Sequence, residues 1–178
     1  MTPFMPNERH CLENNPMNVV SVLTYKSVEH MLRDGGSQAW RADRKRLRKA
    51  KYVVTARHAH GPYKSEGSEA HKHAFLVGKI TEVVDADIDG EAHDDSAPPR
   101  NKIMFTEYAL IDGPELPLSG QNPVQYWPDL AALDIDEGTL NWQTAPEPVV
   151  LTPMERAKAI VAEAHGVTPD RVDITIRF

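Results

Sequence analysis

The sequence predicts an α+β fold, in which a small bent β-barrel carries flanking helices and a C-terminal helix-strand appendage. Three observations support this prediction. Four segments rich in β-branched residues are separated by loops, and one of them has an interior glycine, Gly78, that favours a bulge or bend. A capped helical segment follows a proline-rich stretch near the C-terminus. The length of 178 residues suits one domain with a small addition.

Four stretches of the chain differ in composition. The first contains proline and asparagine without hydrophobic periodicity, and the third contains the prolines of TAPEPVV, which interrupt helices and central strands. We therefore expect a flexible lead-in at 1–17, the barrel domain at 18–143, a linker at 144–153 and the appendage at 154–178.

Four strands are expected in the barrel because their residues are mainly apolar, β-branched or aromatic. They cover residues 19–25, 52–57, 73–84 and 102–111. Within the last of them Glu107 and Tyr108 are neighbours, so one of the two side chains must point inward. A buried Glu107 needs a cation, for which Arg57 is the obvious candidate.

Two helices are expected between the first and second predicted strands. Ser27 caps a short helix that continues to Arg33 and ends at Gly35. Ser37 precedes a second helix over residues 38–50, which has only a thin apolar stripe. The basic side chains of this second helix are therefore expected to face water, acids or a polyanion.

Two further segments have recognisable patterns. The corner NPVQYW, at 122–127, is expected to be a lid over the end of the barrel, with a functional loop as the alternative. Near the C-terminus Thr152, Pro153 and Glu155 form the start of a helix that Gly166 ends. The alternating VDITIRF that follows predicts an edge strand.

The overall composition excludes several classes of protein. Apolar residues make up 40% and charged residues 26%, which is typical of globular domains. No apolar run reaches the roughly 18 residues of a membrane helix, and the N-terminus lacks the order of a signal peptide. The single Cys11 excludes an internal disulfide and a cysteine-based zinc cluster. Glycine-rich phosphate-binding motifs are absent. We expect a cytoplasmic protein without a cofactor and without a membrane partner.

The net charge of −6 hides a compact basic segment. Residues 41–51 contain seven basic residues and one acid, whereas residues 85–95 contain six acids and no Lys or Arg. The basic segment predicts a local anion-binding face, because fields depend on local charge density. The acidic segment is expected to be a solvated loop tip, or alternatively a loop that docks on the basic helix.

Two His-x-His pairs flank the loop between the second and third strands. They are His58 with His60 and His71 with His73. In a strand this spacing puts two imidazoles on one face, as metal sites often require. These four histidines are a candidate metal site, and a metal-dependent enzyme is one alternative function. The other interpretation is that they are polar residues at loop ends near the barrel mouth.

Aromatic residues accompany the basic segment and the histidine-rich loop. Nucleic-acid binders need cations for phosphates and flat rings for unstacked bases, and these residue types supply both. The candidate nucleic-acid-binding residues are Trp40, Arg41, Arg44, Lys45, Arg48, Arg57, His58, His60 and Tyr63. The alternative is that the aromatic rings belong to the core and the charges form a solvated face.

Several features follow one another in a recognisable order. Trp40 heads a segment, the strand YVVTAR ends in arginine, and the strands AFLVGKI and FTEY come later. Over residues 19–143 this order resembles the PUA-like superfamily, in particular its EVE-type domains. The resemblance implies a bent barrel that binds RNA or flipped modified bases in an aromatic pocket, near Trp40, Arg57 and the 58–73 loop. The Gly-x-Lys-x-x-Glu-x-Arg signature of the related ASCH domains is absent.

The sequence thus predicts a non-enzymatic binding module with RNA or modified DNA as its partner. It uses a basic helix and a pocket of aromatic, histidine and arginine side chains. A metal-dependent enzyme built on the four histidines is one alternative. A protein–protein interaction or inhibitor protein, with the basic helix and the acidic loop as partner surfaces, is the other.

Overall fold

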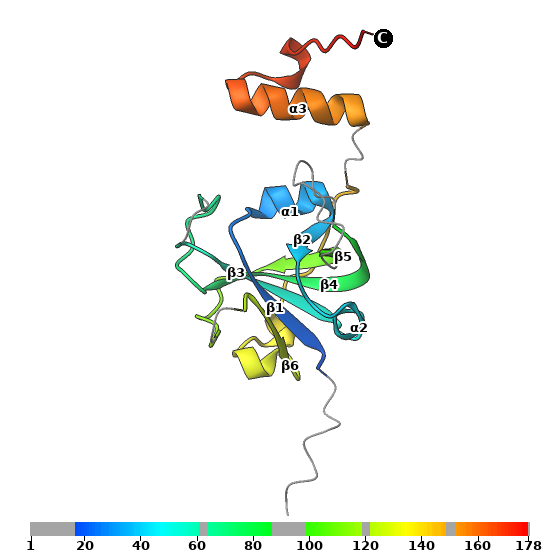
Figure 1. Ribbon diagram of the computed structural model, residues 1–178. Helices are drawn as coiled ribbons and strands as arrows, with labels where there is room; N and C mark the ends of the chain where they lie inside the picture. Colours follow the sequence, from blue (N-terminus) through cyan, green and yellow to red (C-terminus); the bar gives the residue numbers. More distant parts are fainter. Residues whose placement is uncertain (1–16, 61–63, 87–98, 119–121, 149–151, 178) are drawn as a thin grey trace, which may run out of the picture. The chain divides into compact units, whose positions relative to one another are not determined.

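The chain forms one curled, mixed β-sheet and a separate C-terminal unit in the computed structural model (Figure 1). The structure describes residues 17–60, 64–86, 99–118, 122–148 and 152–177. In these residues the sheet has seven strands, in the order β2-β5-β4-β3-β1-β6, with β7 paired to β5. The strands are β1 (Val19–Thr24), β2 (Gly36–Trp40), β3 (Tyr52–Arg57), β4 (Ala74–Asp85), β5 (Asn101–Leu110), β6 (Val124–Trp127) and β7 (Gln143–Thr144).

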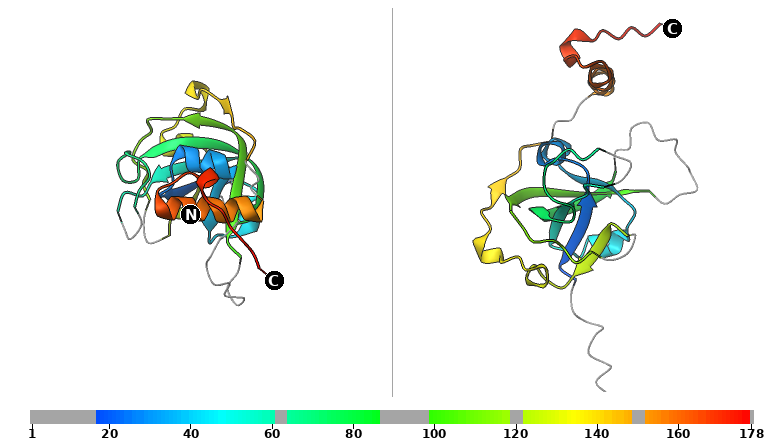
Figure 2. Two further views of the ribbon diagram at one scale, coloured as in Figure 1. Left: turned by 90° about the horizontal axis from the view of Figure 1, so that it is seen from above. Right: turned by 90° about the vertical axis from the view of Figure 1, so that its left-hand side faces the viewer.

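Most neighbouring strands are antiparallel, but β1 and β3 are parallel. A parallel pair requires a crossover connection, which here contains a helix, the edge strand β2 and a helical turn. The sheet curls into a half-barrel (Figure 2). The α+β class and the four predicted strands are therefore confirmed, and the curled sheet is compatible with a small barrel.

Two clusters of buried side chains cover the two faces of the sheet. Val20, Val22 and Val53 belong to one cluster, whereas Val19 and Val54 belong to the other. Successive residues of a strand point to opposite faces, so β1 and β3 are buried on both sides. This double burial explains why both strands are nearly continuous apolar runs in the sequence.

The glycine inside β4 allows close packing rather than a turn. A Cβ atom on Gly78 would lie 2.8 Å from the Cγ atom of Phe105 on the neighbouring strand. The pairing of β4 with β5 becomes irregular just after this point, between Lys79 and Ile80 and again before Glu82. The bend predicted in this strand thus begins one residue beyond the glycine.

The first helix follows the prediction closely. It is α1 (Val28–Asp34), and the hydroxyl of its cap Ser27 accepts a 3.1 Å hydrogen bond from the amide of His30. Gly35 ends it with a φ of 74°, in the left-handed region that glycine enters without strain.

The predicted basic helix over residues 38–50 is wrong. Residues up to Trp40 form the edge strand β2 against β5, and the only helical residues are the single turn α2 (Arg44–Leu47), capped by Asp43. The thin apolar stripe explains the difference, because such a helix buries little, whereas pairing with β5 buries Trp40 to 9% exposure. The basic side chains are therefore spread over a turn and its flanks.

Two further expectations are corrected by the structure. The segment 122–127, expected as a lid, contains the edge strand β6, which pairs with β1 through Val124–Trp127. The indole N–H of Trp127 donates a 2.9 Å hydrogen bond to the hydroxyl of Ser21 and fixes this edge. An edge strand was expected over residues 172–178, but residues 172–177 form no strand.

The inward-pointing residue of β5 is Tyr108 rather than its neighbour. Tyr108 is buried, whereas Glu107 is half-exposed and forms a 3.0 Å ion pair with the Nζ atom of Lys79. The expected pairing of Glu107 with Arg57 is therefore wrong. In the acidic segment only Asp85 and Ala86 belong to the described residues, and Asp85 forms an ion pair with Arg44.

The C-terminal unit, Pro148–Phe178, contains α3 (Pro153–His165) and the 3₁₀ turn η4 (Pro169–Arg171). The predicted capping box is present: the amide of Thr152 donates to the Oε2 atom of Glu155 at 2.8 Å, and the amide of Glu155 donates to the Thr152 hydroxyl at 3.3 Å. None of the helices described has both the length and the apolar character needed to cross a membrane. The remaining 3₁₀ turns, η2 (Ala131–Leu133) and η3 (Glu137–Thr139), belong to the first unit.

Candidate functional site

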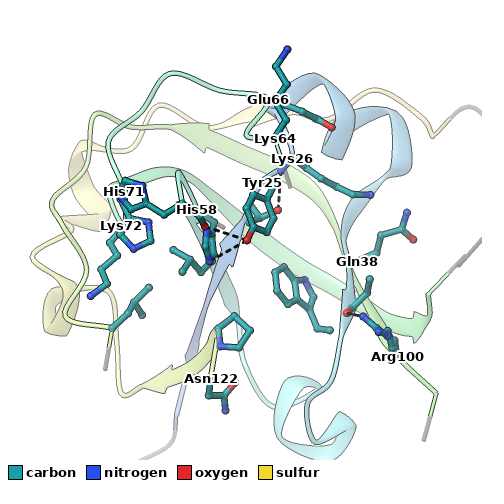
Figure 3. Close-up of a pocket in the computed structure, with 17 residues that line it drawn as sticks. Tyr25, Lys26, Gln38, His58, Lys64, Glu66, His71, Lys72, Arg100 and Asn122 are labelled. Atoms are coloured by element: carbon teal, nitrogen blue, oxygen red, sulfur yellow. Dashed lines mark hydrogen bonds between the residues drawn. The ribbon is translucent and has the colours of Figure 1, made fainter. Parts of the chain in front are cut away.

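A pocket of about 950 Å³ opens beside the ends of the parallel strands β1 and β3 (Figure 3). The register of this pair places Thr24 opposite Arg57, so the next residues, Tyr25 and His58, leave the sheet side by side. The crossover and the loop after β3 supply most of the remaining walls. The residues that line the pocket include Tyr25, Lys26, Gln38, Ala39, Trp40, His58, His60, Lys64, Glu66, His71, Lys72, Arg100 and Asn122.

Flat rings form one wall of this pocket. The ring of Tyr25 stacks on His58 with 4.3 Å between centroids and 27° between planes. The Tyr25 hydroxyl donates to the carbonyl oxygen of His60 at 3.3 Å and lies 3.3 Å from the Nε2 atom of His58. Trp40 also lines the pocket, and its indole N–H donates a 3.0 Å hydrogen bond to the hydroxyl of Ser37. These contacts hold three flat side chains around one space.

Three of the four candidate metal-binding histidines come together here. The ring of His71 lies 5.3 Å from His58 and 4.6 Å from His60, centroid to centroid. The Nδ1 atom of His71 accepts a 3.3 Å hydrogen bond from the amide of Ala59, which requires an unprotonated Nδ1. Among the described residues no group of three or more His, Cys, Asp or Glu is arranged to hold a metal ion. His73 does not line the pocket.

Two histidines of this cluster, His58 and His71, have lowered pKa values. Burial, together with the neighbouring His71 and His60, lowers the pKa of His58 below its ordinary value. Burial, followed by the charges of His60 and Lys72, likewise lowers the pKa of His71, against an opposing effect of Glu115. A histidine with a lowered pKa is neutral near pH 7, so His58 and His71 present flat, uncharged rings.

Arg57 does not line the pocket, but it bonds to two residues that do, Tyr25 and Lys26. Its side chain is 1% exposed, and its Nη1 atom donates to the carbonyl oxygens of Tyr25 and Lys26 at 3.1 and 2.8 Å. Its Nε and Nη2 atoms both lie 2.8 Å from the Oε2 atom of Glu69. The guanidinium therefore ties the end of β1 to the loop after β3, and none of it faces a ligand.

Glu66 makes a second connection between the same two segments. Its Oε2 atom accepts a 2.7 Å hydrogen bond from the amide of Ser27, and its Oε1 atom lies 3.0 Å from the Nδ1 atom of His30 on α1. Burial works to raise the pKa of Glu66, but the bond from Ser27 and the neighbouring His30 lower it. Glu66 is therefore an ionised, already occupied carboxylate.

Basic side chains outnumber acidic ones in the pocket. Four of its lining residues are Lys or Arg and one, Glu66, is a carboxylate. Lys26 pairs with Asp34 at 3.1 Å, and a guanidinium N–H of Arg100 donates to the carbonyl oxygen of Ala39 at 3.5 Å. No salt bridge within the described chain involves Lys64 or Lys72. The pocket therefore suits an anion.

The basic segment of the sequence and the pocket are separate features. Arg41, Lys45 and Arg48 are exposed, and none of them lines the pocket. Arg44 is engaged by Asp85 and by the side-chain oxygen of Asn101, to which its Nε atom donates at 2.7 Å. Tyr63, the remaining candidate, lies outside the described residues.

Sequence reasoning missed much of the pocket wall. Tyr25 follows the first strand, and Gln38 and Arg100 lie on the edge strand β2 and just before β5. Only the parallel pairing of β1 with β3 brings Tyr25 to His58, and the sequence carries no local signal of that pairing. The position of Tyr25 immediately after a buried strand was the available hint.

Backbone strain is concentrated at this pocket. Among the described non-glycine residues only Ala39, Lys72 and Asp134 have a positive φ, and the first two, at 75° and 66°, line the pocket. Left-handed backbone costs a residue with a Cβ atom about 1–2 kcal/mol. Strained residues of this kind gather at functional sites more often than elsewhere.

Replacing Ala39 with glycine is expected to raise the free energy of unfolding by about 1 kcal/mol, because glycine enters the left-handed region without a Cβ clash. Urea denaturation monitored by tryptophan fluorescence measures the change. Ala42→Gly is the matched control: Ala42 lacks a positive φ, so glycine there adds only unfolded-state entropy and should lower stability. A lower stability for A39G would contradict the assignment of strain to this residue.

Comparison with known proteins gives no relative from which a function could be transferred: no family model, curated protein or solved structure matches the chain. The site must therefore be interpreted from its own chemistry.

Proposed function

We propose that this protein is a PUA-like binding module for RNA or modified nucleic acid, and that an unstacked base enters the pocket beside Trp40, Tyr25 and His58. The observation that carries the proposal is the stack of Tyr25 on His58 in a pocket that Trp40 also lines. Aromatic rings bind unstacked bases through their faces, largely independently of sequence.

The charges of the pocket support the same proposal. A nucleotide presents a flat base and an anionic phosphate, and the lining offers uncharged rings together with an excess of basic side chains. Gln38 and Asn122 add amide groups of the kind that pair with base edges. The volume of about 950 Å³ lies within the range of small-ligand sites, and so accommodates one nucleotide.

The replacement Tyr25→Leu tests this proposal, because leucine keeps an apolar side chain but removes the stacking face. Base stacking contributes about 1–3 kcal/mol, so the Kd for a single-stranded RNA oligonucleotide should rise about 5- to 150-fold. Fluorescence anisotropy of a labelled oligonucleotide at fixed salt measures this Kd.

Tyr52→Leu is the matched control for this experiment. Tyr52 is also stacked, on Trp142 with 6.0 Å between centroids, and its hydroxyl donates a 2.5 Å hydrogen bond to Glu137, but it does not line the pocket. The variant Tyr52→Leu should therefore bind the RNA oligonucleotide with a Kd within about twofold of the wild-type value. Equal effects of the two variants, or no binding of any single-stranded RNA or DNA by the wild type, would overturn the proposal.

A further inference from the structure

The helix α1 carries a histidine that lies between two carboxylates. The Nδ1 atom of His30 lies 3.0 Å from the Oε1 atom of Glu66, in the loop after β3, and its Nε2 atom lies 3.4 Å from the Oδ2 atom of Asp34 on α1 itself. A neutral imidazole has one N–H donor, whereas the protonated ring has two. Both carboxylates can therefore accept from His30 only when its ring is protonated.

The two carboxylates connect His30 to the pocket, although His30 itself does not line it. Glu66 is one of the lining residues and contacts His30 directly. Asp34 accepts hydrogen bonds from the Nζ atom of Lys26 at 3.1 Å and from the Nε2 atom of Gln38 at 2.8 Å, and both of these residues line the pocket. His30 is thus connected to three pocket-lining side chains, one directly and two through Asp34. We call Asp34, His30 and Glu66 the His30 clamp.

The charged side chains around the His30 clamp come from three segments. They are Glu29, Arg33 and Asp34 on α1, Lys26 before it, and Glu66 with the neighbouring Lys64 in the loop after β3 (Figure 3). Burial raises the pKa of Asp34, but the hydrogen bond from His30 and the charge of Lys26 hold it well below its ordinary value. The pKa of Glu66 is lowered as well. Both carboxylates are therefore ionised throughout the pH range in which histidine titrates.

On the basis of the proposed function, we infer that protonated His30 is a positioning residue of the pocket, which fastens the loop after β3 to α1 so that nucleic acid binds more tightly at acidic pH. The neutral ring donates to one carboxylate only and leaves the other with fewer donors. As the pH rises and His30 loses its proton, Glu66 and the side chains bound to Asp34 are held less firmly. The clamp itself is a property of the unliganded protein.

The stability of the unliganded protein reports on the clamp. Protonation adds a hydrogen bond in the folded state only, so this stabilisation is complete at acidic pH and is lost as the pH rises through the range in which histidine titrates. Asp34 and Glu66 stay ionised over that range. The lowered pKa values of His58 and His71 act in the opposite direction, because burial favours their neutral rings. Comparison with a variant of His30 at each pH removes this opposing contribution, since both proteins share it.

Urea denaturation of the wild type and of His30→Gln at pH 6 and pH 8.5 tests the clamp. Glutamine offers one uncharged donor nitrogen at every pH, as the neutral imidazole does. The urea midpoint of the wild type should exceed that of the variant by about 0.5 M at pH 6, from one charge-assisted hydrogen bond, and by less than about 0.1 M at pH 8.5.

Two further variants are controls for this measurement. His30→Arg carries a charge and several donors at both pH values, so its higher midpoint relative to His30→Gln should persist at pH 8.5. His165→Gln replaces an exposed histidine of the C-terminal unit and should keep the wild-type pH dependence.

Fluorescence anisotropy with one labelled single-stranded RNA oligonucleotide, at the same two pH values and fixed salt, tests the effect on binding. The Kd of His30→Gln should be about fivefold higher than that of the wild type at pH 6 and within about twofold of it at pH 8.5. The ratio of the two Kd values is the readout, because protonation of the pocket histidines affects both proteins alike. A lost contact between His30 and the RNA does not explain such a ratio, since His30 does not line the pocket.

The outcomes separate the clamp from the proposed function. A midpoint difference between wild type and His30→Gln that is equal at the two pH values would overturn the clamp, and so would a higher midpoint of His30→Arg that disappears at pH 8.5. A pH-dependent midpoint difference with a constant Kd ratio would overturn the positioning role. If the midpoint difference depends on pH but the wild type binds no single-stranded RNA or DNA, the proposed function fails and the clamp remains.

Discussion

Replacing Arg57 with methionine is expected to lower the free energy of unfolding by about 3 kcal/mol. Methionine keeps the apolar stem but removes the guanidinium donor from the part-buried carbonyl oxygens of Tyr25 and Lys26, of which the first keeps only the amide of Glu66, and it leaves Glu69 without its cation. Breaking a buried ion pair typically costs about 3–5 kcal/mol, and the lower end applies because Glu69 is 34% exposed and can be rehydrated. Urea denaturation at pH 7 measures the change.

The variant Glu69→Gln is the control for the ionic part of this network. It removes the negative charge but keeps an oxygen that accepts from Arg57, so we expect a smaller loss of about 1 kcal/mol. If the free energy of unfolding of Arg57→Met lies within about 0.5 kcal/mol of the wild-type value, the guanidinium does not organise this region. A substitution at Gly67 is an independent check of this network, since a Cβ atom on residue 67 would lie 2.1 Å from the Nη2 atom of Arg57 and displace the guanidinium.

Replacing Trp40 with alanine is expected to lower the free energy of unfolding by about 3–5 kcal/mol. Trp40 is 9% exposed and belongs to the same apolar cluster as Val20 and Phe105, so alanine leaves a cavity that the edge strand β2 cannot fill. The midpoint of thermal or urea unfolding measures this loss. Trp142→Ala, at a half-buried tryptophan outside the pocket, should cost less.

Trp40 is at once a core residue and a wall of the pocket, so a loss of binding in Trp40→Ala mixes unfolding with lost stacking. Trp40→Phe separates the two, because it keeps a ring at this position and removes the 3.0 Å bond to Ser37. A stable Trp40→Ala variant would show that the indole does not contribute to the core.

The strands at the centre of the sheet were predictable from the sequence. Residues 19–24 and 52–57 are buried on both faces, so they consist almost entirely of apolar and β-branched residues, and no partner needs to be known to recognise them. The first helix was equally accessible, because Ser27 and Gly35 are local signals that act within the helix they delimit.

The edge strands were not predictable in the same way. Gly36–Trp40 has the composition of a helix start, and its extended conformation comes from β5, some 65 residues later. Val124–Trp127 was interpreted as a lid because its pairing with β1 joins segments about 100 residues apart. Tertiary pairing overrides local preference in both cases.

The candidate site shows the same division between local and long-range information. The histidines and Trp40 stood out by residue type, and the structure places His58, His60, His71 and Trp40 in one pocket. Arg57 was predicted to bind nucleic acid at the pocket, but the structure buries its side chain and pairs it with Glu69. Lys64 and Lys72 carry no distinguishing pattern, and only the folded loop brings them to the same pocket as the histidines.

The parallel pairing of β1 and β3 makes the site modular. Tyr25, Gln38 and Trp40 come from the crossover between these strands, whereas the imidazoles of His58, His60 and His71 come from the single loop that follows β3. That loop also supplies Glu69, the carboxylate partner of the buried Arg57 at the end of β3, so a replacement loop must keep an acidic side chain at this place. Within that constraint the loop sets the ligand preference, while the packing of the central strands holds Tyr25 in place.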